Sequence, residues 1–92
     1  MYTLVTTRHF LRSAKKFIEK HPDIRPRFAK IIDDLKDNPF QSHLNLHPLG
    51  GNLEGIFAVS LTYSYRITLI LKITEKEIIL LDIGSHDDVY RK

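Results

Sequence analysis

The chain of 92 residues is 42% hydrophobic and carries a formal net charge of +3, a composition typical of one small domain spanning residues 1–92. Its longest apolar run has four residues and its first residues lack the features of a signal peptide, so neither a membrane span nor a leader is expected. The absence of cysteine excludes disulfides and thiol chemistry and fits the cytoplasm as the expected location.

A strand and a helix are predicted at the start of the chain. Tyr2–Thr6 is rich in β-branched residues and alternates in polarity, which is typical of a strand. Thr6 or Thr7 then offers a helix cap, and the following residues are apolar at helical spacing until His21-Pro22 ends the pattern. The apolar positions of this helix are Phe10, Leu11, Ala14, Phe17 and Ile18.

A second amphipathic helix is expected after a short joint. Asp23 is its predicted N-cap and Asn38-Pro39 its end, so the two helices form a helical hairpin. Residues 1–30 carry a charge of +6, whereas residues 31–92 carry −3. The basic hairpin is either an ordinary solvated helix face or a surface for phosphate or an acidic protein.

Residues 40–55 are expected to form a loop, because Gly, Pro and Asn are frequent in them. His43 and His47 have the i, i+4 spacing of a helical metal pair, but the neighbouring Pro and Gly residues argue against a helix. No third ligand is suggested, so neither a metal nor another cofactor is expected. The sequence GGNLEG lacks the Lys-Ser/Thr pair of a phosphate-binding loop, and no serine lies in a nucleophile elbow.

Three β-rich segments complete the chain, at Ile56–Thr62, Tyr63–Ile73 and Lys76–Ile83. Short polar joints separate them, which predicts a three-stranded antiparallel meander. The order of strand, two helices and three strands predicts an α+β fold with the helices packed on one face of the sheet.

Four polar side chains are candidates for a site in this half of the chain. His47 lies in the loop before the meander, Arg66 in the middle strand, and His86 and Tyr90 just past the last strand. Residues of these types suit metal-independent cleavage of RNA, in which the 2′-hydroxyl attacks the adjacent phosphate. Two imidazoles can share the acid and base roles, since histidine titrates near neutral pH. An arginine can stabilise the negatively charged phosphate, and a tyrosine can stack on a base.

Each of these residues also has a purely structural interpretation. The two histidines are also consistent with exposed or packing residues. Arg66 is consistent with an ion pair to Asp82, Asp87 or Asp88. Tyr90 is consistent with a core aromatic that fixes the terminus. The three other histidines, His9, His21 and His43, are expected to be structural or exposed.

Three motifs resemble the RelE/ParE superfamily of type II toxin–antitoxin toxins, and in particular its RelE/StbE and YafQ-like branches. They are H-P-L-x-G-N-x-x-G from His47 to Gly55, a loosely spaced S-x-x-Y-R-I from Ser60 to Ile67, and D-I-G-x-H-D-x-V-Y from Asp82 to Tyr90. The resemblance covers nearly the whole chain, because the family has the same order of strand, two helices and β-meander.

This resemblance implies a toxin that cleaves mRNA, usually on the ribosome, and is held inactive by a cognate antitoxin. It assigns Arg66 to the scissile phosphate, His86 to acid catalysis or phosphate binding, Tyr90 to catalysis or stacking, and His47 to the base. The expected RNA-binding residues are Arg12, Lys15 and Lys16 of the first helix, and Tyr65.

Ser60 departs from the family pattern, since RelE-like members carry lysine there and YafQ-like members a second histidine. Two alternatives stay open. A ParE-like inhibitor of DNA gyrase without nuclease activity would share the fold, and the missing basic residue at Ser60 is consistent with a catalytically degenerate protein that still binds an antitoxin.

Overall fold

The computed structural model describes the backbone of residues 1–90 and the side chains of residues 1–89. Its main elements are β1 (Thr3–Thr6), α1 (Arg8–Lys20), α2 (Arg25–Asp37), β2 (His47–Pro48), β3 (Phe57–Ser60), β4 (Tyr65–Lys72), β5 (Glu77–Ser85) and α3 (His86–Tyr90). Three short 3-10 helices lie in the connections: η1 (Pro22–Ile24), η2 (Ser42–Leu44) and η3 (Gly51–Leu53).

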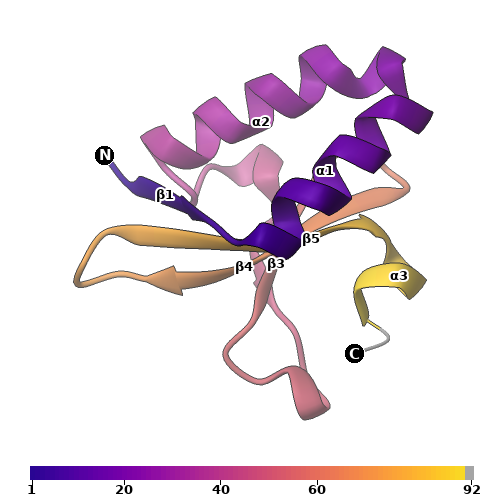
Figure 1. Cartoon of the computed structure of the whole chain (residues 1–92). Coiled ribbons are helices and arrows are strands. Elements are labelled where there is room, and N and C mark those ends of the chain that lie inside the picture. Colours follow the sequence, from indigo (N-terminus) through magenta and orange to yellow (C-terminus); the bar gives the residue numbers. More distant parts are fainter. Residues whose placement is uncertain (91–92) are drawn as a thin grey trace.

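The strands form one mixed sheet in the order β1-β5-β4-β3-β2. β1 pairs with β5 in parallel, and the other neighbours are antiparallel. α1 and α2 lie side by side over one face of this sheet, whereas α3 lies beyond the end of β5 on the other side (Figure 1). The expected α+β arrangement, with the helical hairpin on one face, is confirmed.

Thr7 fixes the start of α1 to the sheet. Its hydroxyl oxygen accepts a hydrogen bond from the Phe10 amide at 3.0 Å, and the hydroxyl donates to the Leu80 carbonyl at 3.0 Å. This cap directs Phe10 and Phe17 of α1 into the core, where they are 3% and 8% exposed. The rest of the core comes from α2, η2 and the strands: Ile31, Leu35, Leu44, Val59, Leu61, Ile67, Leu69, Ile78, Leu80 and Ile83.

The predicted cap of the second helix is wrong. Asp23 lies inside η1, and α2 begins at Arg25 after Ile24, whose side chain makes no cap hydrogen bond. Pro22 at the start of η1 cannot donate a backbone hydrogen bond, and it begins a separate short turn in place of the first turn of α2.

The predicted strand boundaries also shift at the end of the meander. β5 continues beyond Ile83 through Gly84 to Ser85, because Ser85 pairs with Tyr65 at the start of β4. The expected loop 40–55 contains the two-residue edge strand β2, and the hairpin with η3 at its tip projects away from the sheet (Figure 1). Among residues 1–90, no helix has the length and apolar character needed to cross a membrane.

Candidate functional site

Arg66 lies on the sheet face that points away from α1 and α2. Its neighbours on β4 face the helices, since Tyr65 contacts Phe17 of α1 and Ile67 is part of the core. Side chains alternate along a strand, so Arg66 points to the opposite face. Its cross-strand partners are Ser60 on β3 and Gly84 on β5.

The predicted residue His47 shares this face of the sheet. It pairs with Ala58, which is two residues before Ser60 on the same strand, and cross-strand partners point to the same side. The Nδ1–H of His47 donates to the Asn45 carbonyl at 2.7 Å. In the neutral ring this bond places the lone pair on Nε2, which is the form of a general base.

His86 is the first residue of α3 and follows directly after β5, next to the strand position of Arg66. A reciprocal capping pair fixes this short helix: the Ser85 amide donates to Asp88 Oδ2 at 3.2 Å, and the Asp88 amide donates to Ser85 Oγ at 3.3 Å. The His86 side chain is 58% exposed, and its Nδ1 lies 3.8 Å from Asp87 Oδ1.

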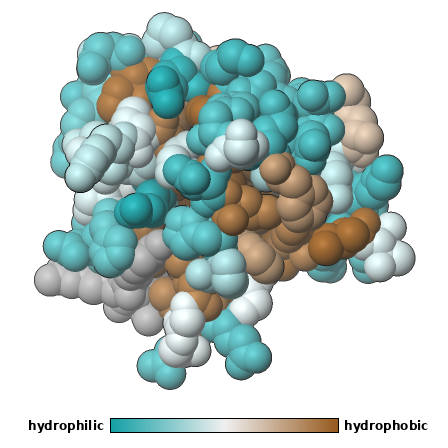
Figure 2. Space-filling model, turned by 180° about the vertical axis from the view of Figure 1, so that it is seen from behind, coloured by the Kyte–Doolittle hydropathy of each residue, from teal (hydrophilic) through white to brown (hydrophobic). Residues whose placement is uncertain are grey.

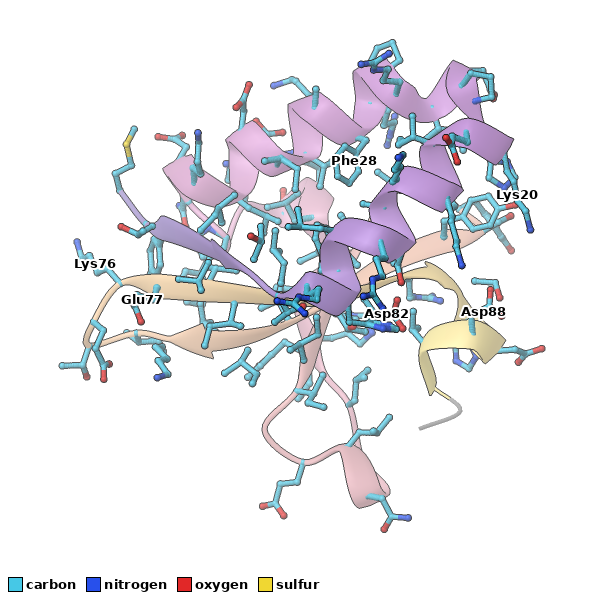
Figure 3. All side chains as sticks on the ribbon, viewed as in Figure 1. Lys20, Phe28, Lys76, Glu77, Asp82 and Asp88 are labelled. Carbon is cyan, nitrogen blue, oxygen red and sulfur yellow. The ribbon has the colours of Figure 1, made fainter. Side chains whose placement is uncertain are left out.

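Gly84 allows α3 to approach the strand closely. A Cβ at this position would lie 3.0 Å from the Cβ of Asp88. Figure 3 shows Asp88 between α3 and the end of the sheet, with Lys20 of α1 on the other side. Since Gly84 is the register partner of Arg66, α3 begins next to the strand position that carries the arginine. The side chain of Tyr90, the fourth predicted residue, lies outside the described part of the chain.

A polar groove of about 440 Å³ contains Arg66. It lies where η2, β3 and the β3–β4 turn meet, and Ser60, His43 and Tyr63 also line it. Tyr63 is 94% exposed. Arg27 reaches the groove from α2, where its Nε donates to the Leu61 carbonyl at 2.8 Å. Two guanidinium groups, an imidazole and an exposed aromatic ring therefore lie around one groove.

His43 is oriented by a carboxylate of α2. Its Nε2 lies 2.8 Å from Oδ2 of Asp34, whose Oδ1 accepts a hydrogen bond from Lys30 Nζ at 3.1 Å. The hydrogen bonds from His43 and Lys30 lower the pKa of the Asp34 carboxyl, and its partial burial opposes them. Asp34 is thus held as a carboxylate, and its side chain is only 12% exposed.

The predicted RNA-binding residues are distributed over the other side of the sheet. Tyr65 packs against Phe17 and His21, with ring centroids 4.9 and 5.0 Å away. It shares a groove of about 380 Å³ with Lys16, next to the start of α3. Lys15 lies at a separate groove between α1 and α2, and Arg12 is exposed on α1.

The fold is shared with solved bacterial toxins. The structure superposes on YafQ from E. coli with a TM-score of 0.80 and 14% identity, covering 98% of this chain and 99% of that chain. For a metal-bound toxin from Helicobacter pylori the TM-score is 0.78 at 23% identity, with 98% and 100% covered. For the RelBE2 toxin–antitoxin complex from Mycobacterium tuberculosis it is 0.69 at 21%, with 92% and 98% covered.

This chain has the RelE/ParE-type toxin fold. The resemblance seen in the sequence is therefore confirmed at the level of the fold. Neither the protein-family models nor the curated protein sequences contain a match to the chain.

Within this RelE/ParE-type fold, the structure adds three groove residues to those predicted for the site: His43, Arg27 and Tyr63. His43 and His47 have the i, i+4 spacing of a metal pair, but they lie in η2 and β2 and not on one α-helix. Across residues 1–90, no three His, Asp or Glu side chains are arranged to hold a metal ion.

Proposed function

We propose that this protein is the toxin of a type II toxin–antitoxin system and that it cleaves mRNA on the ribosome to inhibit translation. The observation that supports this best is the register of the sheet. It puts His47, Ser60 and Arg66 on one face and starts α3, with His86, at the end of that face. The fold shared with YafQ and RelBE2 supports the same conclusion.

The reaction needs a phosphate ligand, a base and an acid. The guanidinium of Arg66 offers planar donors to the scissile phosphate and stabilises the charge that grows on it. A histidine takes the proton of the 2′-hydroxyl, and His47 is the residue that the sequence assigns to this role. His86, exposed at the start of α3, protonates the leaving 5′-oxygen. The products are a 2′,3′-cyclic phosphate and a 5′-hydroxyl.

An antitoxin is the expected protein partner. A groove of about 580 Å³ runs between α1 and α2, with Ile18, Phe28 and Ile32 along it and charged side chains at its rim. Such a groove suits the apolar face of an amphipathic helix.

The surface also carries exposed hydrophobic residues outside this groove. Leu11 and Phe40 are more than half exposed. From behind, hydrophobic residues gather near the middle of the surface, while hydrophilic residues cover most of the helical part (Figure 2).

Expression without an antitoxin tests the proposal. We expect growth and translation to stop, and Arg66→Ala or His86→Ala to restore growth and reduce cleavage of RNA at least about 100-fold. His9→Ala, which removes an exposed histidine of α1, is the control and should stay toxic. DNA damage without translational arrest would favour the gyrase inhibitor instead, and a folded parent that neither arrests translation nor cuts RNA would contradict the proposal.

A further inference from the structure

His43 has the surroundings of a proton-transfer residue. Its imidazole is half exposed, so one side of the ring is open to solvent while Nε2 bonds to the nearly buried carboxylate of Asp34. Because a carboxylate only accepts, Nε2 carries the hydrogen and the neutral ring has its lone pair on Nδ1. The carboxylate also stabilises the imidazolium that forms when Nδ1 takes up a proton.

Two further hydrogen bonds hold the partner of this ring and the segment that carries it in place. Lys30 holds the other oxygen of Asp34, and the side-chain amide of Gln41 donates to the Asp34 carbonyl at 2.9 Å. These bonds tie the segment that carries His43 to α2. A ring held in this way loses little conformational freedom when a substrate binds, which is the condition for an efficient general base.

The groove beside His43 has the composition of a site for single-stranded RNA. Arg66 and Arg27 supply positive charge for phosphate, and Tyr63 offers an exposed ring on which a base can stack. Ser60 lies in the same groove without a charge of its own. Neither His47 nor His86 is among the residues that line this groove in the described part of the chain. His86 starts α3 two residues after Gly84, the register partner of Arg66.

We propose that His43, positioned by Asp34, is the general base of the RNA cleavage, in the role that the sequence assigned to His47. Nδ1 of His43 takes the proton of the 2′-hydroxyl, the 2′-oxygen forms a bond to phosphorus, and the bond from phosphorus to the 5′-oxygen breaks. The 5′-oxygen receives its proton from His86. The base assignment rests on the proposed function, because it names a residue of the same site.

The test compares single histidine variants over a range of pH, with naked RNA and with mRNA on translating ribosomes. His43→Gln keeps an N–H that can reach Asp34 but cannot take up a proton. We expect it to lower kcat at least about 100-fold with little change in KM. Because a general base must be unprotonated to act, kcat of the parent should rise with pH, and this rise should be absent in His43→Gln. His47→Gln should leave that rise in place.

A matched control exists on α1. His9 is also paired with a nearly buried aspartate, Asp82, at 3.3 Å, and it is similarly exposed, but it does not line the Arg66 groove. His9→Gln should change kcat less than about twofold. Asp34→Asn should lower kcat about tenfold at unchanged KM, because it misorients the ring without removing it.

A second variant guards against a folding defect. If His43→Gln melts well below the parent, His43→Ala is assayed with added imidazole, which should restore part of the activity. If the parent cleaves RNA and His43→Gln is fully active, the base assignment is overturned and the proposed function still stands. The same holds if the parent cleaves RNA and imidazole does not rescue an inactive His43→Ala. A parent that cuts no RNA in either assay overturns both.

Discussion

Gly84 determines how closely α3 approaches the sheet. It is buried in β5, and its missing side chain leaves the space that the Asp88 Cβ and Oδ2 occupy. The capping pair between Ser85 and Asp88 depends on this short distance, and His86 lies between those two residues. A backbone position without a side chain thus places the imidazole that we assign to the acid.

Gly84→Ala should therefore displace α3. The added methyl group would lie 3.0 Å from the Asp88 Cβ and 3.1 Å from its Oδ2, so the helix must move. We expect a loss of about 1–3 kcal/mol in the free energy of unfolding, by urea titration, and faster hydrogen exchange at the α3 amides. Gly50→Ala is the control, because nothing lies within 4 Å of its Cβ position and its φ is −93°. Equal stability and exchange in both variants would show that the contact does not constrain α3.

His43 shows where prediction from sequence ends at this scale. The alternation along β4 already indicated that Arg66 and Tyr65 face opposite sides, and the structure agrees. The hydrogen bond of His43 to Asp34, nine residues earlier, depends on how the loop folds back onto α2. Loop geometry has no periodicity to read, so the sequence predicts only a structural or exposed residue at His43 and favours His47 as the base.

At the scale of elements, β5 contains an irregularity that its sequence hides. Leu69 pairs with Leu80 while the preceding Thr68 pairs with Asp82, so Leu81 is an extra residue in the strand. The bulge lets Leu80 and Ile83, three residues apart, both face the core. The run of apolar residues predicted a buried strand correctly, but without alternation it could not give the register.

The short helix α3 was also missed, although a signal for it was present. Ser85 and Asp88 form the pattern of a serine followed three residues later by an acidic residue, which typically begins a helix. The two-residue strand β2 had no comparable signal, since a segment of that length shows no pattern. The helical hairpin and the three long strands were predictable because each has several turns or alternations.

The connection between α2 and η2 should weaken in acid. Lys30 and His43 bond to the Asp34 carboxylate, with Arg27 nearby in the same cavity, and the two hydrogen bonds lower the Asp34 pKa. A lowered folded-state pKa gives stability that is present above about pH 4 and is lost as the pH falls through the folded value. We expect the free energy of unfolding of Asp34→Asn to fall less between pH 5 and pH 2.5 than that of the parent, as measured by urea titration at each pH. Asp37→Asn, which changes an exposed aspartate at the end of α2, serves as the control. An equal fall of the free energy of unfolding with pH in Asp34→Asn and the parent would contradict the expectation.

At the scale of the whole molecule, the lysines of α1 and the side chain of Arg66 occupy different sides of the sheet. The first thirty residues, which carry a charge of +6, form β1, α1 and the first part of α2, and the helices cover one face. Arg66 and His47 lie on the other face. Arg27 of α2 reaches the Arg66 groove from this basic segment, whereas Lys16 lines a separate groove with Tyr65, next to the start of α3.

This division predicts separate effects on binding and on chemistry. The double variant Lys15→Ala/Lys16→Ala should weaken binding of single-stranded RNA and lower the slope of log Kd against log salt by about 1.4, since each phosphate contact contributes about 0.7. The rate of cleavage at saturating RNA should stay within about twofold of the parent, because neither lysine lies at Arg66. Lys36→Ala/Lys72→Ala removes the same charge from exposed positions on α2 and β4, and should leave the slope nearly unchanged. If both double variants lower the slope of log Kd against log salt equally, RNA binding depends only on net charge and α1 makes no specific contact. If the Lys15/Lys16 variant loses cleavage at saturating RNA, α1 and the Arg66 face act as one site.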